Sequence, residues 1–181
     1  GALQSGLTRL EWSPTTAPVV GAGVAGEARN GLSSQLHRAR TDLAAFLASY
    51  LTTTRATEAP MLLLGQPGAG KSSLTRILAA RLPAGDFFVS RVALREVPAE
   101  AEIQDQIELA LHTAIGEAVS WAELSRDAEG ALPVVLLDGF DELLQATGLH
   151  QSDYLQRVAV FQQREASLGR PVAVLVTSRV A

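Results

Sequence analysis

The stretch that decides the fold is GQPGAGKS, residues 65–72, which stands between a short apolar run and a segment with helical spacing. It matches the pattern G-x-x-x-x-G-K-[ST] at every fixed position, and the run before it, MLLLG at residues 61–65, is typical of a buried strand. Glycines allow a loop between a strand and a helix to bend around a phosphate group, so that backbone N–H groups and the positive end of the helix face it. The sequence therefore predicts a phosphate-binding loop, whose residues are Gly65, Gln66, Pro67, Gly68, Ala69, Gly70, Lys71, Ser72 and Ser73.

Lysine is almost absent from the chain, and this sets Lys71 apart. Of the 15 Lys and Arg residues, Lys71 is the only lysine. Arg and Lys differ in size, hydration and hydrogen-bond geometry, so a single lysine inside the loop indicates a need for an ammonium group there. We expect Lys71 to bridge the β- and γ-phosphates of a bound nucleotide, and the Ser72 hydroxyl to bind Mg²⁺, the usual counterion of a triphosphate.

Apolar runs and segments with helical spacing alternate along the chain. The runs that predict strands are residues 61–65, 87–94, 133–138 and 171–179. Helical spacing predicts helices from Ser33 or Ser34 to between Leu51 and Thr54, over 70–82, 103–115 and 121–124, and from Ser152 or Asp153 to Gly169. This alternation predicts an α/β fold, a three-layer P-loop NTPase core with a parallel sheet over residues 33–181, preceded by an extended lead-in at residues 1–32.

The third predicted strand ends in acidic residues. Asp138 stands at its carboxyl end, and Asp141 and Glu142 follow one turn later. Ligands of an open parallel sheet bind outside the carboxyl ends of the strands, so we expect Asp138 to hold Mg²⁺, directly or through a water molecule. Asp141 and Glu142 are candidates for the base that deprotonates an attacking water, and we prefer Glu142. The alternative is that both acids only favour the start of a solvated helix.

A polar cluster, Thr177, Ser178 and Arg179, ends the fourth predicted strand at the same edge of the sheet. Thr177 or Ser178 can hydrogen-bond the γ-phosphate or the attacking water, and Arg179 can place positive charge near it. The alternative is a solvated strand end. The predicted catalytic residues are thus Asp138, Asp141, Glu142 and Arg179, the metal ligands are Ser72 and Asp138, and Thr177 and Ser178 join the nucleotide-binding residues.

Together, GQPGAGKSS, VVLLDGFDEL and VAVLVTSR resemble the Walker A, Walker B and sensor 1 segments of the NACHT family, and most of all its bacterial members. This family belongs to the STAND class of signal-transduction P-loop NTPases. The most specific similarity is a small residue, Gly139, directly after the Mg²⁺ aspartate, with the acidic pair displaced downstream. AAA+ motors place a glutamate immediately after that aspartate. The sequence Thr177-Ser178-Arg179 is also typical of the family.

The resemblance implies a sheet order of 5-1-4-3-2, in which the fifth strand is missing here and the core ends after sensor 1. It implies an ATP/ADP switch with slow Mg²⁺-dependent hydrolysis coupled to self-association, joined to effector and sensor domains outside this chain. It also implies apolar contacts to adenine upstream of the phosphate loop, here near residues 18–20. Two alternatives stay open: a nonenzymatic oligomerisation platform that holds nucleotide as a structural ligand, and an AAA+-like ATPase.

The overall composition argues against several other classes of protein. The formal net charge is -4 and there is no cysteine, so a general nucleic-acid surface, disulfides and thiolate zinc sites are disfavoured. No run approaches the ~20 apolar residues that cross a bilayer, and the first residues lack a signal peptide, so we expect a cytoplasmic protein. The three histidines have no metal-ligand spacing, and with one lysine the chain has no [NT]-K-x-D motif for guanine.

Overall fold

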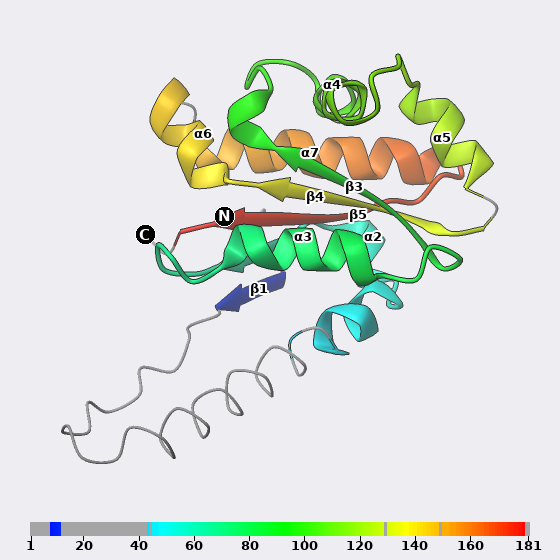
Figure 1. The fold of residues 1–181 in the computed structure, drawn as a ribbon, viewed down its shortest axis with the longest axis horizontal. Helices are drawn as coiled ribbons and strands as arrows, with labels where there is room; N and C mark the ends of the chain where they lie inside the picture. The colour runs from blue at the N-terminus through cyan, green and yellow to red at the C-terminus, as the bar shows by residue number, and fades with distance from the viewer. Residues whose placement is uncertain (1–7, 12–42, 44, 129, 149, 180–181) are drawn as a thin grey trace.

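The computed structural model of the chain describes residues 8–11, 43, 45–128, 130–148 and 150–179 (Figure 1). Parallel strands form one five-stranded sheet in the order β1-β2-β5-β4-β3. The strands are β1 (Thr8–Glu11), β2 (Met61–Leu64), β3 (Phe87–Ala93), β4 (Leu132–Asp138) and β5 (Ala173–Ser178). The predicted α/β fold is confirmed. Because β5 lies between β2 and β4, the strands that lead to the three motifs are direct neighbours.

The resemblance implied that the strand beside β2, at the edge of the sheet, is missing from this chain. The structure differs at this edge. The edge is occupied by β1, which comes from the predicted lead-in and pairs in parallel with β2 from Thr8↔Met61 to Glu11↔Leu64. A strand that joins through backbone hydrogen bonds can come from any part of the chain, which is why order along the sequence did not reveal it. The rest of residues 1–32, with the suggested adenine contact at residues 18–20, lies outside the described residues.

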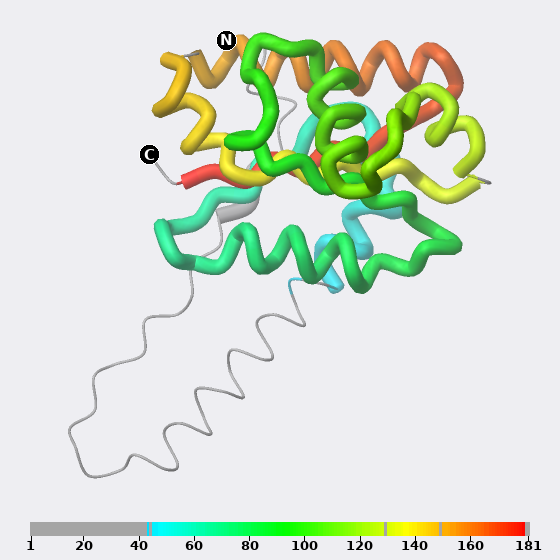
Figure 2. The backbone as a smooth tube through the Cα atoms, turned by 45° about the horizontal axis from the view of Figure 1, so that its top comes forward, coloured from blue at the N-terminus to red at the C-terminus, as the bar shows by residue number. Residues whose placement is uncertain are grey.

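Helices cover both faces of the sheet and complete three layers (Figures 1 and 2). One face carries α3 (Lys71–Arg81) and helical residues 45–51, and the other carries α4 (Ile103–Ile115), α5 (Trp121–Asp127), α6 (Phe140–Thr147) and α7 (Gln151–Ser167). Two short helical turns lie beside these strands in the chain: α2 (Arg55–Glu58) precedes β2, and η1 (Leu94–Glu96) follows β3. Within the part of the chain that the structure describes, no helix is long and apolar enough to cross a membrane.

Each face of the sheet has its own apolar core, because the central strands are buried on both sides. In β4, Val134 and Leu136 pack toward α3, whereas Val135 and Leu137 pack toward α4 to α7. Trp121 is fully buried in the second core, and its indole Nε1 donates a hydrogen bond to Glu165 over 3.1 Å. The two cores fix the central strands rigidly, so that their carboxyl ends present side chains in a defined arrangement.

Candidate functional site

The loop between β2 and α3 has a backbone conformation that its glycines permit. Gly68 and Gly70 have φ angles of 75° and 86°, in the left-handed region that other residues rarely adopt. Gly70 is the N-cap of α3 and brings no side chain to cap the helix, so the first N–H groups of α3 face outward for a ligand or solvent. The Gly65 N–H donates to the carbonyl oxygen of Ser178 over 3.1 Å, which ties the start of the loop to the end of β5.

Lys71 is the first residue of α3 and reaches back over this loop. Its Nζ donates hydrogen bonds to the carbonyl oxygens of Gly65, at 2.7 Å, and Gln66, at 3.1 Å. These contacts hold the ammonium group at the mouth of the loop. An ammonium in that place can form charge-assisted hydrogen bonds with phosphate oxygens.

Asp138, at the end of β4, joins the three motif segments. Its Oδ1 accepts hydrogen bonds from Thr177 Oγ1 at 2.8 Å and from Ser72 Oγ at 3.1 Å. Its Oδ2 accepts from Arg91 Nη2 at 2.5 Å. Thr177 Oγ1 in turn accepts from the backbone N–H of Gly139 at 3.1 Å. The aspartate, which is only 5% exposed, is therefore held in one orientation by groups from β5, α3 and β3.

The environment of Asp138 keeps its carboxyl group ionised. Burial raises the pKa of Asp138, because it removes water from the charged form. Hydrogen bonds from Thr177, Arg91 and Ser72 lower the pKa, and so does the positive charge of Arg91. Together these lowering effects outweigh the effect of burial, so the pKa of Asp138 lies below its ordinary value of 3.8. Asp138 is therefore a carboxylate at neutral pH, as a metal ligand must be.

Arg91 and Thr75 belong to the site but were not identified from the sequence. Arg91 lies on β3 opposite Leu136 of β4, two residues before Asp138, so both side chains emerge on the α3 face of the sheet. Its Nε donates to Thr75 Oγ1, on α3, over 3.0 Å. The only sequence signal was a charged residue within the apolar run of β3, and its meaning depends on which strand lies next to it.

The two acidic residues in the first turn of α6, Asp141 and Glu142, make different contacts. Asp141 Oδ2 forms an ion pair with Arg179 Nε at 2.5 Å. Glu142 is exposed, and its side chain makes no hydrogen bond or ion pair with another described residue. The Glu142 carboxylate lies over Gly139, where a Cβ atom would be 3.6 Å from Oε2. The structure thus brings Asp141 and Arg179 together and leaves the Glu142 carboxylate accessible to solvent.

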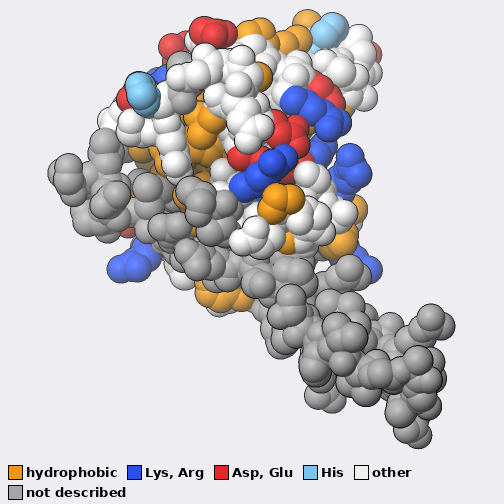
Figure 3. Space-filling view, turned by 90° about the vertical axis from the view of Figure 1, so that its left-hand side faces the viewer, with side chains coloured by type: hydrophobic (Ala, Val, Ile, Leu, Met, Phe, Trp, Pro, Cys, Tyr) orange, Lys and Arg blue, Asp and Glu red, His pale blue; other side chains and the backbone are white. Residues whose placement is uncertain are grey.

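The other predicted residues surround this centre. Gln66, Pro67 and Ser73 are exposed on the loop and the first turn of α3, and Ser178 is buried at the end of β5. Figure 3, which faces the carboxyl ends of the strands, shows acidic and basic side chains side by side over this edge of the sheet. The site is therefore a charged surface built around one buried carboxylate.

Comparison with known families agrees with this geometry. Residues 61–178 match the profile of the ATPase family associated with various cellular activities (AAA). The chain belongs to the AAA family. The match begins at the first residue of β2 and ends at the last residue of β5, so it contains the phosphate loop, Asp138 and Thr177. No curated protein and no solved structure matches the chain significantly. Membership of the AAA family makes this a P-loop ATPase domain.

The donor set of the site fits Mg²⁺, which AAA domains normally bind with ATP or ADP. Ser72 Oγ and Asp138 Oδ1 are hard oxygen donors that lie 3.1 Å apart. Mg²⁺ is typically held by one or two carboxylates together with phosphate oxygens and water, so a single carboxylate and a hydroxyl are sufficient from the protein. Ser72 and Asp138 are the residues that would hold the ion.

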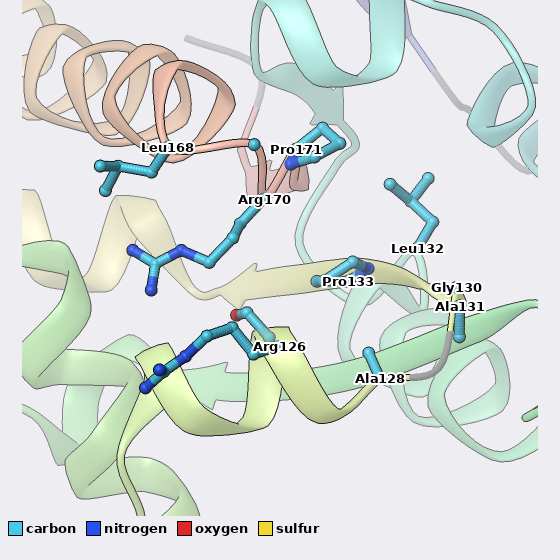
Figure 4. A pocket seen from close by; sticks show the side chains of 11 residues that line it. Arg126, Ala128, Gly130, Ala131, Leu132, Pro133, Leu168, Arg170 and Pro171 are labelled. Atoms are coloured by element: carbon cyan, nitrogen blue, oxygen red, sulfur yellow. The ribbon is translucent and has the colours of Figure 1, made fainter.

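A hollow of about 800 Å³ lies at the opposite end of the sheet, where β4 begins and the chain enters β5 (Figure 4). Arg126 and Arg170 extend from its wall, and Pro133 and Pro171 line it. Ligands of parallel sheets bind at the carboxyl ends of the strands, and this hollow is at the amino ends. We therefore do not include it in the nucleotide site.

Proposed function

We propose that this AAA domain is an ATP/ADP switch of the STAND class, similar to NACHT domains, with slow Mg²⁺-dependent ATP hydrolysis. In this proposal ADP stabilises a resting state and ATP an assembling one, and the domain self-associates in the cytoplasm under the control of effector and sensor domains outside this chain. The observation that carries the proposal is the residue after Asp138. Gly139 occupies that position, with a φ of 89°, and the two acids are displaced to the first turn of α6.

The roles that we assign to individual residues follow from their contacts. Lys71 binds the β- and γ-phosphates, and Ser72 and Asp138 hold Mg²⁺, which supplies neutralising charge to the phosphates. Thr177 is 1% exposed and bonded to Asp138, so we assign it the positioning of that carboxylate. Ser178 lies at the strand end next to the loop, where we expect it to contact the nucleotide.

Glu142 is our candidate for the base, because its carboxylate is accessible and has no partner among the described residues. It would accept a proton from the water that attacks the γ-phosphate. Asp141 instead holds Arg179 through the ion pair at 2.5 Å. We propose that this pair positions Arg179 to place positive charge near the γ-phosphate when ATP is bound.

Two alternatives use the same site. An AAA+-like motor ATPase is supported equally by the family match. A nonenzymatic platform would hold nucleotide through the phosphate loop without turnover. The switch, the motor and the platform differ in the rate of ATP hydrolysis and in the fate of the ADP that is formed.

Single-turnover and multiple-turnover ATPase assays on the same protein separate them. A switch hydrolyses ATP slowly and releases ADP more slowly than it forms it. A motor turns over repeatedly at more than about 1 s⁻¹, within the usual range of enzymes. Fast repeated turnover would contradict the STAND proposal in favour of a motor, and bound ATP that is never hydrolysed would contradict it in favour of a platform.

A further inference from the structure

The Arg91 guanidinium occupies the oxygen of Asp138 that faces away from Ser72. Ser72 and Thr177 both donate to Oδ1, whereas Oδ2 accepts from Arg91 Nη2 at 2.5 Å. The side chain of Arg91 is 23% exposed and that of Asp138 is 4% exposed. This ion pair is therefore partly shielded from water and is stronger than one on the open surface.

Arg91 is fixed from its other side as well. Its Nε donates to Thr75 Oγ1 over 3.0 Å, and the Thr75 hydroxyl donates to the backbone carbonyl oxygen of Ser72 at 3.0 Å. Thr75 is 1% exposed, so this anchor lies in the interior, between β3 and α3. The guanidinium is thus linked to both residues that would hold Mg²⁺, directly to Asp138 and through Thr75 to the backbone of Ser72.

We propose that Arg91 competes with Mg²⁺ for Asp138 and so limits how much the metal strengthens nucleotide binding. A cation that takes Oδ2 must displace the guanidinium, and one bound between Ser72 and Oδ1 meets its positive charge. Arg91 also compensates the buried carboxylate, which would otherwise be an unpaired charge in the interior. The inference rests on the proposed binding of Mg²⁺ and nucleotide at this site.

One consequence concerns nucleotide binding without metal. The competition depends on the concentration of free Mg²⁺, because both cations are attracted to the same carboxylate. Without Mg²⁺, Asp138 is paired with Arg91, so the site does not need the metal to keep its shape. The wild-type protein should therefore bind ADP in EDTA with an affinity that Mg²⁺ improves only modestly.

The test compares nucleotide affinity with and without metal. A fluorescent ADP analogue is titrated into wild type, Arg91→Gln and Arg91→Met, once in excess Mg²⁺ and once in EDTA. The measured quantity is the ratio of the two affinities, which cancels any general loss of nucleotide binding. Removal of one unit charge beside a divalent ion should raise this ratio by about three- to tenfold in both neutral variants. Arg91→Lys keeps the charge and should raise it less.

Arg95→Gln is the matched control. Arg95 follows β3 on the exposed turn η1, its side chain is 62% exposed, and it pairs only with the adjacent Glu96 among the described residues. Arg95→Gln changes the net charge as much as Arg91→Gln does, but it should leave the ratio of the two affinities as in wild type. Circular dichroism checks that the glutamine and methionine variants are folded. Because these side chains differ in polarity, a folded form of either one is sufficient for the test.

Two results would overturn the inference, and they differ from each other. If wild type binds the analogue but a folded neutral variant has the same or a lower ratio, Arg91 does not compete with Mg²⁺ and the proposed function stands. If wild type binds no analogue in either condition, the nucleotide site itself is wrong and the inference fails with it.

Discussion

Asp141 and Glu142 are adjacent in the sequence but have different surroundings. Asp141 is paired with Arg179, and Glu142 is exposed. We predict that Glu142→Gln retains ATP binding and slows hydrolysis by about 10²-fold or more, because an amide cannot accept the proton of the water. Asp141→Asn should have a smaller effect. Single-turnover hydrolysis of radiolabelled ATP measures both, and if Asp141→Asn alone stops hydrolysis, the base is assigned to the wrong acid.

Gly139 should be intolerant of a side chain for a backbone reason. Its φ of 89° lies in the left-handed region, and its N–H donates to Thr177. We predict that Gly139→Ala lowers the free energy of unfolding by about 1–2 kcal/mol. Gly85→Ala is the control, because the φ of Gly85 lies outside the left-handed region and a Cβ atom there would meet open space. Urea denaturation should show a larger loss at Gly139, and equal losses would show that the conformation of Gly139 carries no strain penalty.

At the residue scale, sequence reasoning could find what local spacing encodes. Lys71 and Ser72 were predicted because the loop motif is contiguous, and the structure places them at the loop as expected. Their chemical roles stay predictions. Arg91 could not be predicted, because its function depends on the register of β3 against β4. That register is set by the packing of whole strands and leaves no short motif.

At the element scale, Tyr154 connects α7 to α4. It is 1% exposed, and its hydroxyl donates to Gln106 Oε1 over 2.7 Å. Burial raises the pKa of Tyr154, and the nearby charge of Arg157 only partly opposes this. The folded state therefore keeps the proton above pH 10, where the unfolded chain releases it, and the free energy of unfolding must fall as the pH rises further.

Comparison with Tyr154→Phe isolates this effect. At pH 8 the variant should be about 1 kcal/mol less stable, because Gln106 loses a hydrogen bond. Above pH 10 only wild type has the buried titrating phenol, so its advantage should shrink by up to about 1.4 kcal/mol per pH unit. Urea unfolding from pH 8 to 11 measures the difference, and a constant gap would contradict the prediction.

The strand β1 makes a second prediction at this scale. Removal of residues 1–11 would leave the outer edge of β2 unpaired, and unpaired edges join with other chains. We predict that this deletion raises self-association with concentration, as measured by light scattering after gel filtration. Deletion of residues 1–7 retains β1 and is the control. If both shortened chains have the same mass as the full chain, the β1 pairing does not protect the edge.

The elements themselves could be predicted unequally. The central strands and α3 were predicted well, because strands buried on both faces produce unbroken apolar runs. The predicted start of α7 at Ser152 or Asp153, residues that commonly cap helices, is wrong. The helix begins at Gln151 after His150, with no side-chain cap, and Ser152 Oγ donates a hydrogen bond to Asp153 instead. Polar residues are common at helix starts, so composition alone cannot decide which one caps the helix.

At the scale of the whole molecule, the sheet order creates the site. The phosphate loop, Asp138 and Thr177 are far apart in the sequence, and only the placement of β5 between β2 and β4 brings them to one edge. The resemblance implied this order for four strands, and the structure confirms it. Without that order, the same three motifs would not share a carboxylate.

Nucleotide binding at the phosphate loop is tested by the affinity of a fluorescent ATP analogue for wild type, Lys71→Ala and Arg81→Ala in the presence of Mg²⁺. Lys71 lies at the loop, whereas Arg81 is an exposed cation at the other end of the same helix. Loss of charge-assisted hydrogen bonds to phosphate should weaken binding by at least about tenfold in folded Lys71→Ala. Arg81→Ala should bind as wild type does. Unchanged affinity in folded Lys71→Ala would contradict the assignment of this loop as the nucleotide site.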